Sequence, residues 1–440
     1  MSGPRSEAGT GSYGRGAAVL SVGIGVTGLV TYTYFGLASH TLSEDDYGRI
    51  SLLWSAIFII VSVLYRPVEQ LLSRTIADHD ARGIGGTHHL RVAATIQLAL
   101  ALAYAVGALA LRGPIEDDLF DGETALYWIF IVTVLAYAAS YFARGFLAGH
   151  HRFGLYGGLV LLESTSRCMF AVLAAVGITS GQDAVALGMV AAPFASLLVV
   201  PWAIGRRLRR LEAADPSREL DAAAQGEPAK EAEFTLTRGG GFAAAVLVIM
   251  LAEQTFLNAG PLVVKATEGA RGSALAGFAF NVLLIARAPL QLFQAIQTSI
   301  LPHLTKARAG GQQDTFRRSV NVTLAAIAAF AAAVALVMLA LGPWLMGVFF
   351  GGEFDYDRLG LVLISLGMGL YLAAATLNQA ALARARAREA ALGWIACALL
   401  FVGLLLVPGF DDRIVQLELA YVAGALVLCA YLALLYRRGD

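Results

Sequence analysis

The chain has 440 residues, and 58% of them are apolar, well above the roughly 45–50% that is usual in soluble domains. Its mean hydropathy is +0.67, and its 32 basic and 32 acidic residues give a net charge of zero. These values exclude an ordinary soluble globular protein and leave no basic excess for a nucleic-acid partner. They indicate an all-α polytopic membrane protein.

Apolar runs long enough to cross a membrane recur along the chain. About 20 residues are needed to span ~30 Å of hydrocarbon at about 1.5 Å per residue. The first run is too long for a cleavable signal peptide and lacks a cleavage site, so we expect it to stay in the membrane. We predict twelve transmembrane helices, at residues 16–40, 48–73, 90–111, 124–146, 154–178, 184–205, 240–264, 273–304, 318–341, 358–383, 390–408 and 415–436.

The basic residues of the expected loops lie on one side of the membrane, and the acidic residues lie on the other. The basic side includes Arg74, Arg82, Arg144, Arg152, the basic run at 206–210, and Arg388. An excess of Lys and Arg marks the cytoplasmic side. We therefore expect both termini in the cytoplasm and the protein in the bacterial cytoplasmic (inner) membrane.

The longest hydrophilic segment divides the chain into two halves. We predict an N-terminal lobe at 1–205, a cytoplasmic linker at 206–238 and a C-terminal lobe at 239–440. The halves repeat weakly: ARGIGGTHHLR follows the second expected helix and ARAGGQQDTFR follows the eighth. Both copies cross the membrane in the same direction, so we expect two six-helix lobes related by a parallel repeat around a central cavity.

Four polar residues form a stripe along the expected helix 273–304. Arg287, Gln291, Gln294 and Thr298 are spaced i, i+4, i+7 and i+11, which places them within about 40° on one helix face. Such a stripe can act as interhelical hydrogen-bond glue, at about 0.6 kcal/mol per contact. Glue does not need an arginine, so the stripe favours a passage for a polar, anionic substrate.

The segment YRPVEQLLSR places Arg66 and Glu69 inside an expected membrane helix, with Pro67 between them. A charge at the centre of a spanning helix costs about 2.5–3.5 kcal/mol, so it normally faces a partner or a watery space. The two charges could pair with each other at i, i+3. Pro67 is expected to bend the helix. The segment is therefore either an ion pair or part of a substrate passage.

Other charges inside the expected helices leave similar alternatives. Glu253 has no basic residue within one turn; it pairs across the cavity with Arg66 or Arg287, or it is a protonatable carboxyl group. Asn258 follows it, and Gly260 with Pro261 predicts a helix break. Glu163 and Arg167, at i, i+4, could neutralise each other.

The histidines and cysteines are not expected to form a metal or cofactor site. The pairs His88–His89 and His150–His151 are adjacent in sequence, and neighbouring side chains rarely point at one ligand. The three cysteines lie in apolar helices and are interpreted as small core residues. We expect no metal, no cofactor and no catalytic residue.

The chain resembles the bacterial polysaccharide (oligosaccharide) flippases of the multidrug/oligosaccharidyl-lipid/polysaccharide exporter superfamily. The resemblance covers nearly the whole chain and rests on the 6+6 helix plan and on SEDDYGRISLLW, its echo ALAGFAFNVLL, YRPVEQLLSR and ARGFLAGHHRFGLYG. It implies alternating access and a polyprenyl-diphosphate-linked oligosaccharide as cargo. By resemblance, Arg66 and Arg287 lie in helices that supply cavity arginines.

The resemblance also frames the alternatives. Multidrug exporters of the superfamily usually have an acidic residue in the first helix, whereas GVTGLVTYTYFGLASH has none; Glu253 could replace it in a cation-coupled exporter. Twelve helices rather than fourteen disfavour the peptidoglycan-precursor flippases. A polytopic polymerase or ligase would need a larger external loop. Partners implied are the lipid-linked substrate, membrane lipids and other polysaccharide-assembly proteins.

Overall fold

The computed structural model describes residues 7–82, 87–198, 236–269, 272–285, 287, 313–351, 356–384 and 386–438. Throughout these ranges the chain is helical and contains no strand. Nine helices of the described part are long and apolar enough to cross a membrane, and Gln182–Leu197 and Gly272–Ile285 are shorter apolar helices. The predicted all-α class is confirmed.

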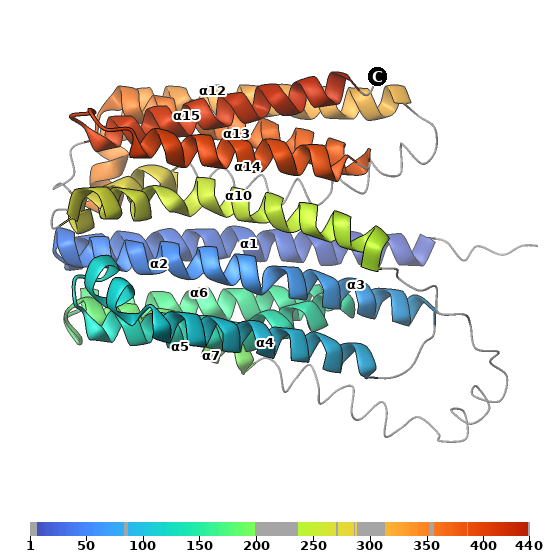
Figure 1. The fold of residues 1–440 in the computed structure, drawn as a ribbon, viewed down its shortest axis with the longest axis horizontal. Helices are drawn as coiled ribbons and strands as arrows, with labels where there is room; N and C mark the ends of the chain where they lie inside the picture. The colour runs from blue at the N-terminus through green and yellow to red at the C-terminus, as the bar shows by residue number, and fades with distance from the viewer. Residues whose placement is uncertain are drawn as a thin grey trace, which may run out of the picture.

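The helices form two lobes that lie side by side (Figure 1). The N-terminal lobe comprises α1 (Glu7–Thr41), α2 (Glu44–Leu64), α3 (Arg66–Arg82), α4 (His88–Ala110), the π-helix η1 (Pro114–Leu119), α5 (Thr124–Gly149), α6 (Phe153–Ala175) and α7 (Gln182–Leu197). The C-terminal lobe comprises α10 (Leu236–Glu268), the helix Gly272–Ile285, α12 (Gln313–Phe350), α13 (Arg358–Ala383), α14 (Ala387–Leu406) and α15 (Arg413–Arg437).

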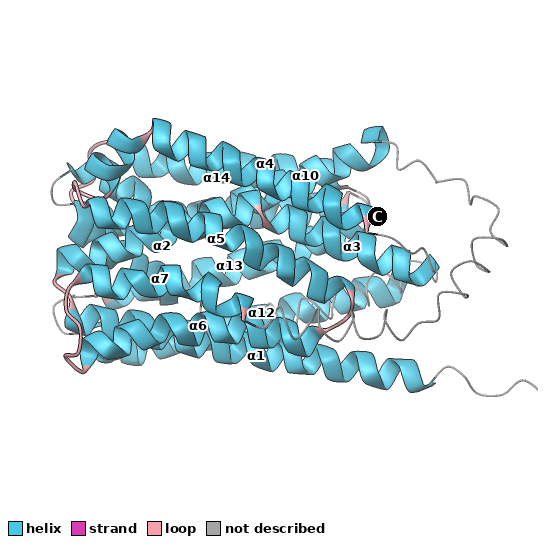
Figure 2. Cartoon of the chain, turned by 90° about the horizontal axis from the view of Figure 1, so that it is seen from below, coloured by secondary structure: helices cyan, strands magenta, loops and turns pink. Residues whose placement is uncertain are grey.

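The two lobes meet mainly along α1, α2 and α10. Within the N-terminal lobe α1 packs on α6, and within the C-terminal lobe α13 packs on α12 and α15. Across the lobes α2 packs on α10, and α1 also contacts α12, beside which it lies in Figure 2. Of the linker 206–238, residues 206–235 lie outside the described residues, and α10 begins at Leu236.

Acidic and hydroxyl side chains cap helices at the end of the molecule where α2, α13 and α15 begin. Ser43 accepts a hydrogen bond from the backbone N–H of Asp46 at 3.2 Å. Asp357 accepts from the N–H groups of the second and third residues after it, both at 3.1 Å, and Asp412 does the same for α15. These caps satisfy N–H groups that have no partner within the helix, and the negative charge suits the helix N-terminus.

Prolines act differently at two places. The predicted helix 48–73 is interrupted for one residue at Tyr65, and α3 starts at Arg66, where Pro67 cannot donate a backbone hydrogen bond. The bend expected from Pro67 stays a prediction. The break expected at Gly260 and Pro261 is wrong, because α10 continues through both residues. Gly260 instead allows close packing: a Cβ there would lie 2.8 Å from methyl groups of Leu283 and Leu417.

Large apolar side chains cover the outer surface of both lobes. Leu98 on α4, Leu336 on α12 and Leu399 on α14 are about two-thirds exposed, a pattern suited to contact with lipid. The interior of the C-terminal lobe holds aromatic rings instead: Phe256 stacks on Phe401 with ring centroids 5.2 Å apart. The polar residues described below lie inside these apolar walls.

Candidate functional site

Charged residues of the two lobes approach each other near the middle of the molecule. Arg66 on α3 and Glu253 on α10 are both half-buried, and each acts electrostatically on the other. Of the two partners that the sequence left open for Glu253, the structure brings Arg66 within electrostatic range. Among the described residues, no direct ion pair joins them.

Glu69 is bound by its own lobe rather than by Arg66. The Tyr156 hydroxyl on α6 donates a hydrogen bond of 2.9 Å to Glu69 Oε1. The charges of Arg144 and Arg66 both act on this carboxylate. The i, i+3 spacing therefore does not produce a direct Arg66–Glu69 ion pair in the described part of the chain, and Glu69 packs toward α5 and α6 instead.

A buried polar cluster in the N-terminal lobe corrects the expectation for Glu163 and Arg167. Glu163 pairs with Arg144 and accepts a hydrogen bond from Ser140. Arg167 donates instead to the Tyr137 hydroxyl at 2.9 Å. The Glu163–Arg167 pairing predicted from i, i+4 spacing is therefore wrong.

Arg144 was counted among the basic residues of the cytoplasmic side, near the end of the predicted helix 124–146; it lies within α5 with only 11% of its side chain exposed. The sequence held a signal for this position. Tyr137, Ser140 and Tyr141 precede Arg144 by seven, four and three residues, which places all of them on one face of the expected helix 124–146.

Arg287 differs from these charges because no hydrogen-bond acceptor for its side chain is found among the described residues. Its side chain is 9% exposed, and within the described part of the chain both Nε and Nη2 lack a partner, whereas in Arg144 and Arg167 only Nε does. The guanidinium carbon lies 5.3 Å from the centroid of the Phe280 ring. The groups that act on it electrostatically are the phenols of Tyr32, Tyr371 and Tyr421. No carboxylate of the described chain is among them.

Tyr371 on α13 links these observations. It is 3% exposed, and the charges of Arg66, Glu253 and Arg287 all act on it. We call these four residues the central cluster. Tyr371, Tyr421 and Tyr32 were missed in the sequence, although a tyrosine in an apolar helix supplies a polar end that usually needs a partner when it is buried.

The remaining predicted residues contribute less to the central cluster. Asn258 is buried, and its Nδ2 donates to Gln254 Oε1 at 3.0 Å within α10, while its Oδ1 has no partner in the part of the chain that the structure describes. Gln291, Gln294 and Thr298 lie outside the described residues. No group of three or more His, Cys, Asp or Glu side chains in the described part of the chain could hold a metal ion.

Two relatives are similar in sequence to this chain over most of its length. No family model matches the chain. An uncharacterized protein of Mycobacterium tuberculosis is 26% identical over 412 residues, covering 91% of this chain and 87% of its own length. A second uncharacterized protein of that organism is 27% identical over 458 residues, covering 98% of this chain and 94% of its own length.

Solved structures of transporters share the fold. The inward-facing conformation of a multidrug resistance MATE family transporter of the MOP superfamily has a TM-score of 0.69 at 14% identity, covering 96% of this chain and 98% of that one. An outward-facing conformation of such a transporter scores 0.62 at 15% identity, covering 97% and 95%. A MOP superfamily transporter from Pyrococcus furiosus scores 0.65 at 14% identity, covering 97% and 95%. Its description says that the reverse polarity of its binding pocket suggests a different function.

These likenesses place the chain in a fold of twelve transmembrane helices in two lobes, and with its many apolar helices they indicate a multi-pass membrane protein. The structural neighbours are transporters and not enzymes. The identities are too low for the neighbours' substrates to pass to this chain.

Proposed function

We propose that the protein is a flippase that moves a polyprenyl-diphosphate-linked oligosaccharide across the bacterial cytoplasmic membrane for cell-surface polysaccharide synthesis. The observation that supports this most is Arg287, a buried guanidinium with two donors that lack an acceptor among the described residues. Leaving such donors unpaired costs about 1–3 kcal/mol. A diphosphate supplies oxygens in the bidentate geometry that arginine prefers.

Arg66 supplies the second cation from the opposite lobe. Because Arg66 and Arg287 both act on Tyr371, a diphosphate between the lobes would meet one arginine from each. Glu253 competes with the substrate for Arg66 and keeps capture reversible. Gln291, Gln294, Thr298 and Asn258 are proposed to bind the sugars, and the prenyl tail stays in lipid.

Alternating access provides the transport step. The fold is more similar to the inward-facing neighbour, at a TM-score of 0.69, than to the outward-facing one, at 0.62. We assign this structure to a state that receives cargo from the cytoplasm, with both termini on that side. Rocking of the lobes then exposes the head group outside, where polysaccharide-assembly proteins receive it.

Binding of a polyprenyl diphosphate by the purified protein in lipid nanodiscs tests the proposal. Arg287→Met removes two charge-assisted hydrogen bonds of about 1.5 kcal/mol each, so we expect about 100-fold weaker binding. Arg66→Met should act similarly, and Arg287→Lys should restore binding only in part. Arg318→Ala is the matched control, because this arginine is exposed on α12. Unchanged binding by both Met variants would contradict the proposal.

A cation-coupled multidrug exporter is the second candidate. Its supporting observations are the multidrug transporters among the neighbours and Glu253, a half-buried carboxylate at the lobe interface. In that case a cationic dye, and no polyprenyl diphosphate, should bind the wild-type protein. Glu253→Gln should then abolish dye export.

A further inference from the structure

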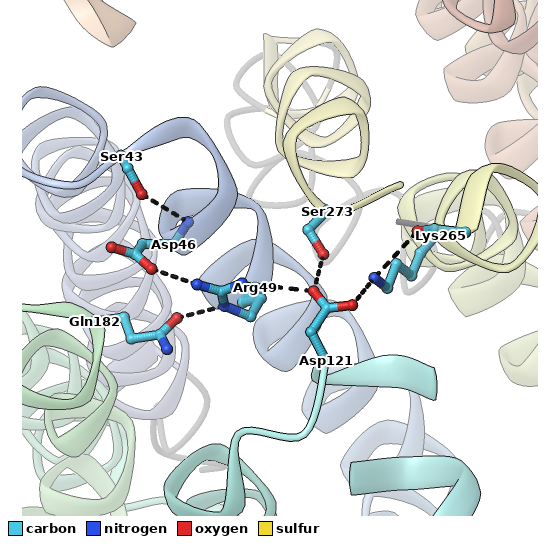
Figure 3. Close-up of polar contacts among 8 residues, drawn as sticks. Ser43, Asp46, Arg49, Asp121, Gln182, Lys265 and Ser273 are labelled. Carbon is cyan, nitrogen blue, oxygen red and sulfur yellow. Dashed lines mark hydrogen bonds and ion pairs between the residues drawn. The ribbon is translucent and has the colours of Figure 1, made fainter. Parts of the chain in front are cut away.

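A second polar cluster joins the lobes at the end of the molecule where α2 begins and α10 ends, which the proposed orientation places on the outer side (Figure 3). Its centre is Asp121, in the turn between η1 and α5. Asp121 Oδ1 pairs with Lys265 at the end of α10. Asp121 Oδ2 accepts a hydrogen bond of 2.6 Å from Ser273 Oγ. Arg49 Nη1 lies 3.5 Å from the same oxygen. Asp121 and Arg49 belong to the N-terminal lobe, whereas Lys265 and Ser273 belong to the C-terminal lobe.

The N-terminal lobe holds its part of this cluster firmly. Arg49 Nε donates to Gln182 Oε1 at 2.7 Å, and Arg49 Nη2 pairs with Asp46 at 2.5 Å. Asp121 itself has a φ of 54°, and Gly122 follows with a φ of 81°. Aspartate and glycine tolerate this left-handed backbone better than most residues. The turn thereby presents the Asp121 carboxylate to the opposite lobe.

Close packing seals the interface beside the cluster. A Cβ on Gly277 would lie 3.0 Å from the Cα of Gly48, so the two backbones nearly touch. The Tyr47 hydroxyl donates to Asn281 Oδ1 across the lobes. Phe35 on α1 packs on Phe280 with ring centroids 4.6 Å apart. Polar and apolar contacts therefore close the outer side together.

We propose that Asp46, Arg49, Asp121, Gln182, Lys265 and Ser273 form an outer latch, and that the Asp121–Lys265 pair sets the balance between the inward-facing and outward-facing states. The proposal rests on the alternating-access part of the proposed function, and it is independent of the cargo. The latch must break whenever the outer side opens, because its two halves belong to different lobes.

The energetics of this pair favour a switchable contact. The Lys265 side chain is 3% exposed, whereas that of Asp121 is 30% exposed. A buried ammonium needs its partner while the lobes are closed, and opening would return it to water. Burial alone raises the pKa of Asp121, but the hydrogen bonds from Lys265 and Ser273 and the charges of Lys265 and Arg49 hold it below its ordinary value. The closed latch is therefore ionised.

Removing one member should favour the open state. Asp121→Asn leaves Lys265 buried without an anion and removes the charge that Arg49 meets within its own lobe. Asparagine tolerates the left-handed backbone at this position. Lys265→Met removes the buried charge and the ion pair with Asp121 across the two lobes. Both variants should raise the outward-facing population about tenfold or more, since breaking a buried pair by one partner shifts equilibria by at least that factor.

Spin labels on the outer loops measure this population without touching the interface. In the full chain with Cys168, Cys397 and Cys429 replaced by Ala, labels at Ser180→Cys and Asp411→Cys report the distance between the lobes. Both positions are exposed. Double electron–electron resonance in nanodiscs should show a longer distance in Asp121→Asn and Lys265→Met.

Two outer ion pairs within single lobes provide the controls. Glu116→Gln removes the pair with Arg112, and Glu268→Gln removes the pair with Arg413, each at 2.6 Å. Neither should change the distance. An unchanged distance in both latch variants, or an equal change in the controls, would overturn the latch. Failure of the proposed cargo would appear only in the polyprenyl diphosphate binding experiment, so the two failures are distinguishable.

Discussion

Two buried arginines occupy contrasting environments in the two lobes. Arg144 in the N-terminal lobe lies over the Tyr141 ring at 4.5 Å and pairs with Glu163. Arg287 in the C-terminal lobe lies over the Phe280 ring at 5.3 Å, but it has no carboxylate partner among the described residues, and two of its nitrogen atoms lack an acceptor there, against one in Arg144. Both guanidinium groups gain from an aromatic face, and only one is neutralised by the described part of the protein.

The difference distinguishes an arginine that stabilises the folded lobe from an arginine that is free to bind a ligand. A paired buried charge is part of the folded lobe, because removal of its partner leaves an uncompensated charge. An unpaired buried charge lowers the stability of the empty protein and is retained where a ligand completes it. The burial of the arginine is similar in both cases, so the partner and not the residue type predicts the role.

Arg144→Ala should give the largest loss of stability. It leaves Glu163 buried without its cation, which costs about 3–5 kcal/mol. Thermal unfolding and membrane abundance of the variant measure the effect. The double variant Arg144→Met with Glu163→Met should recover most of the loss, because it removes both charges and keeps apolar volume. A double variant as unstable as Arg144→Ala would show that the pair has another function.

Arg287→Met should act in the opposite direction on the same measurement. Removing donors that lack acceptors relieves about 1–3 kcal/mol, so the thermal stability of the empty protein should stay constant or rise. Export should nevertheless be lost. A fall in stability comparable to that of Arg144→Ala would mean that Arg287 has a structural partner and would remove the contrast between the two lobes.

Arg66→Ala sharpens the comparison within α3. Glu69 accepts its hydrogen bond from Tyr156, so loss of Arg66 should leave membrane abundance near normal while export fails. Adding Glu69→Ala should not restore export. Normal export by this double variant would show instead that the two residues form an ion pair with no role in substrate binding. Tyr156→Phe tests the alternative partner and should lower abundance more than Arg66→Ala.

The smallest expected effect concerns the outer latch: mild acid should not change the distance between the two lobes. A carboxyl group with a lowered pKa stabilises the closed state fully above its open-state pKa of about 3.9, and loses this contribution only as the pH falls through the lowered value. The facing groups are Arg49, Lys265 and Asp46. The distance between the Ser180 and Asp411 labels should therefore stay constant from about pH 8 to about pH 5. Opening within that range would contradict a permanently ionised latch.

The sequence predicted the helices better than their interruptions. Hydropathy located the helices because the apolar surface must match the lipid thickness along the whole segment. Pro67 lies beside a one-residue interruption between α2 and α3, whereas α10 continues through Pro261. The difference depends on packing: Gly260 is fixed against Leu283 and Leu417, and such contacts with distant segments leave no local signal.

The sequence could predict which charged residues belong to the candidate site, but it could not predict which of them contact each other. Spacing rules allowed Glu163 to pair with Arg167 and Glu69 to pair with Arg66. In the structure Glu163 pairs with Arg144, and Glu69 accepts a hydrogen bond from Tyr156. Partners on the same helix contribute only tenths of a kcal/mol. A partner on a neighbouring helix stabilises a buried charge more than a partner on its own helix does, when it lies within direct hydrogen-bonding distance.

Gly48 makes the outer interface sensitive to a single methyl group. A Cβ at this position would overlap the carbonyl group of Ser273 on the opposite lobe. Alanine therefore fits only when the lobes separate, so this substitution should favour the separated arrangement. A binder raised against a Gly48→Ala protein would consequently recognise surfaces of α2 and of the helix Gly272–Ile285 that the packed lobes keep hidden.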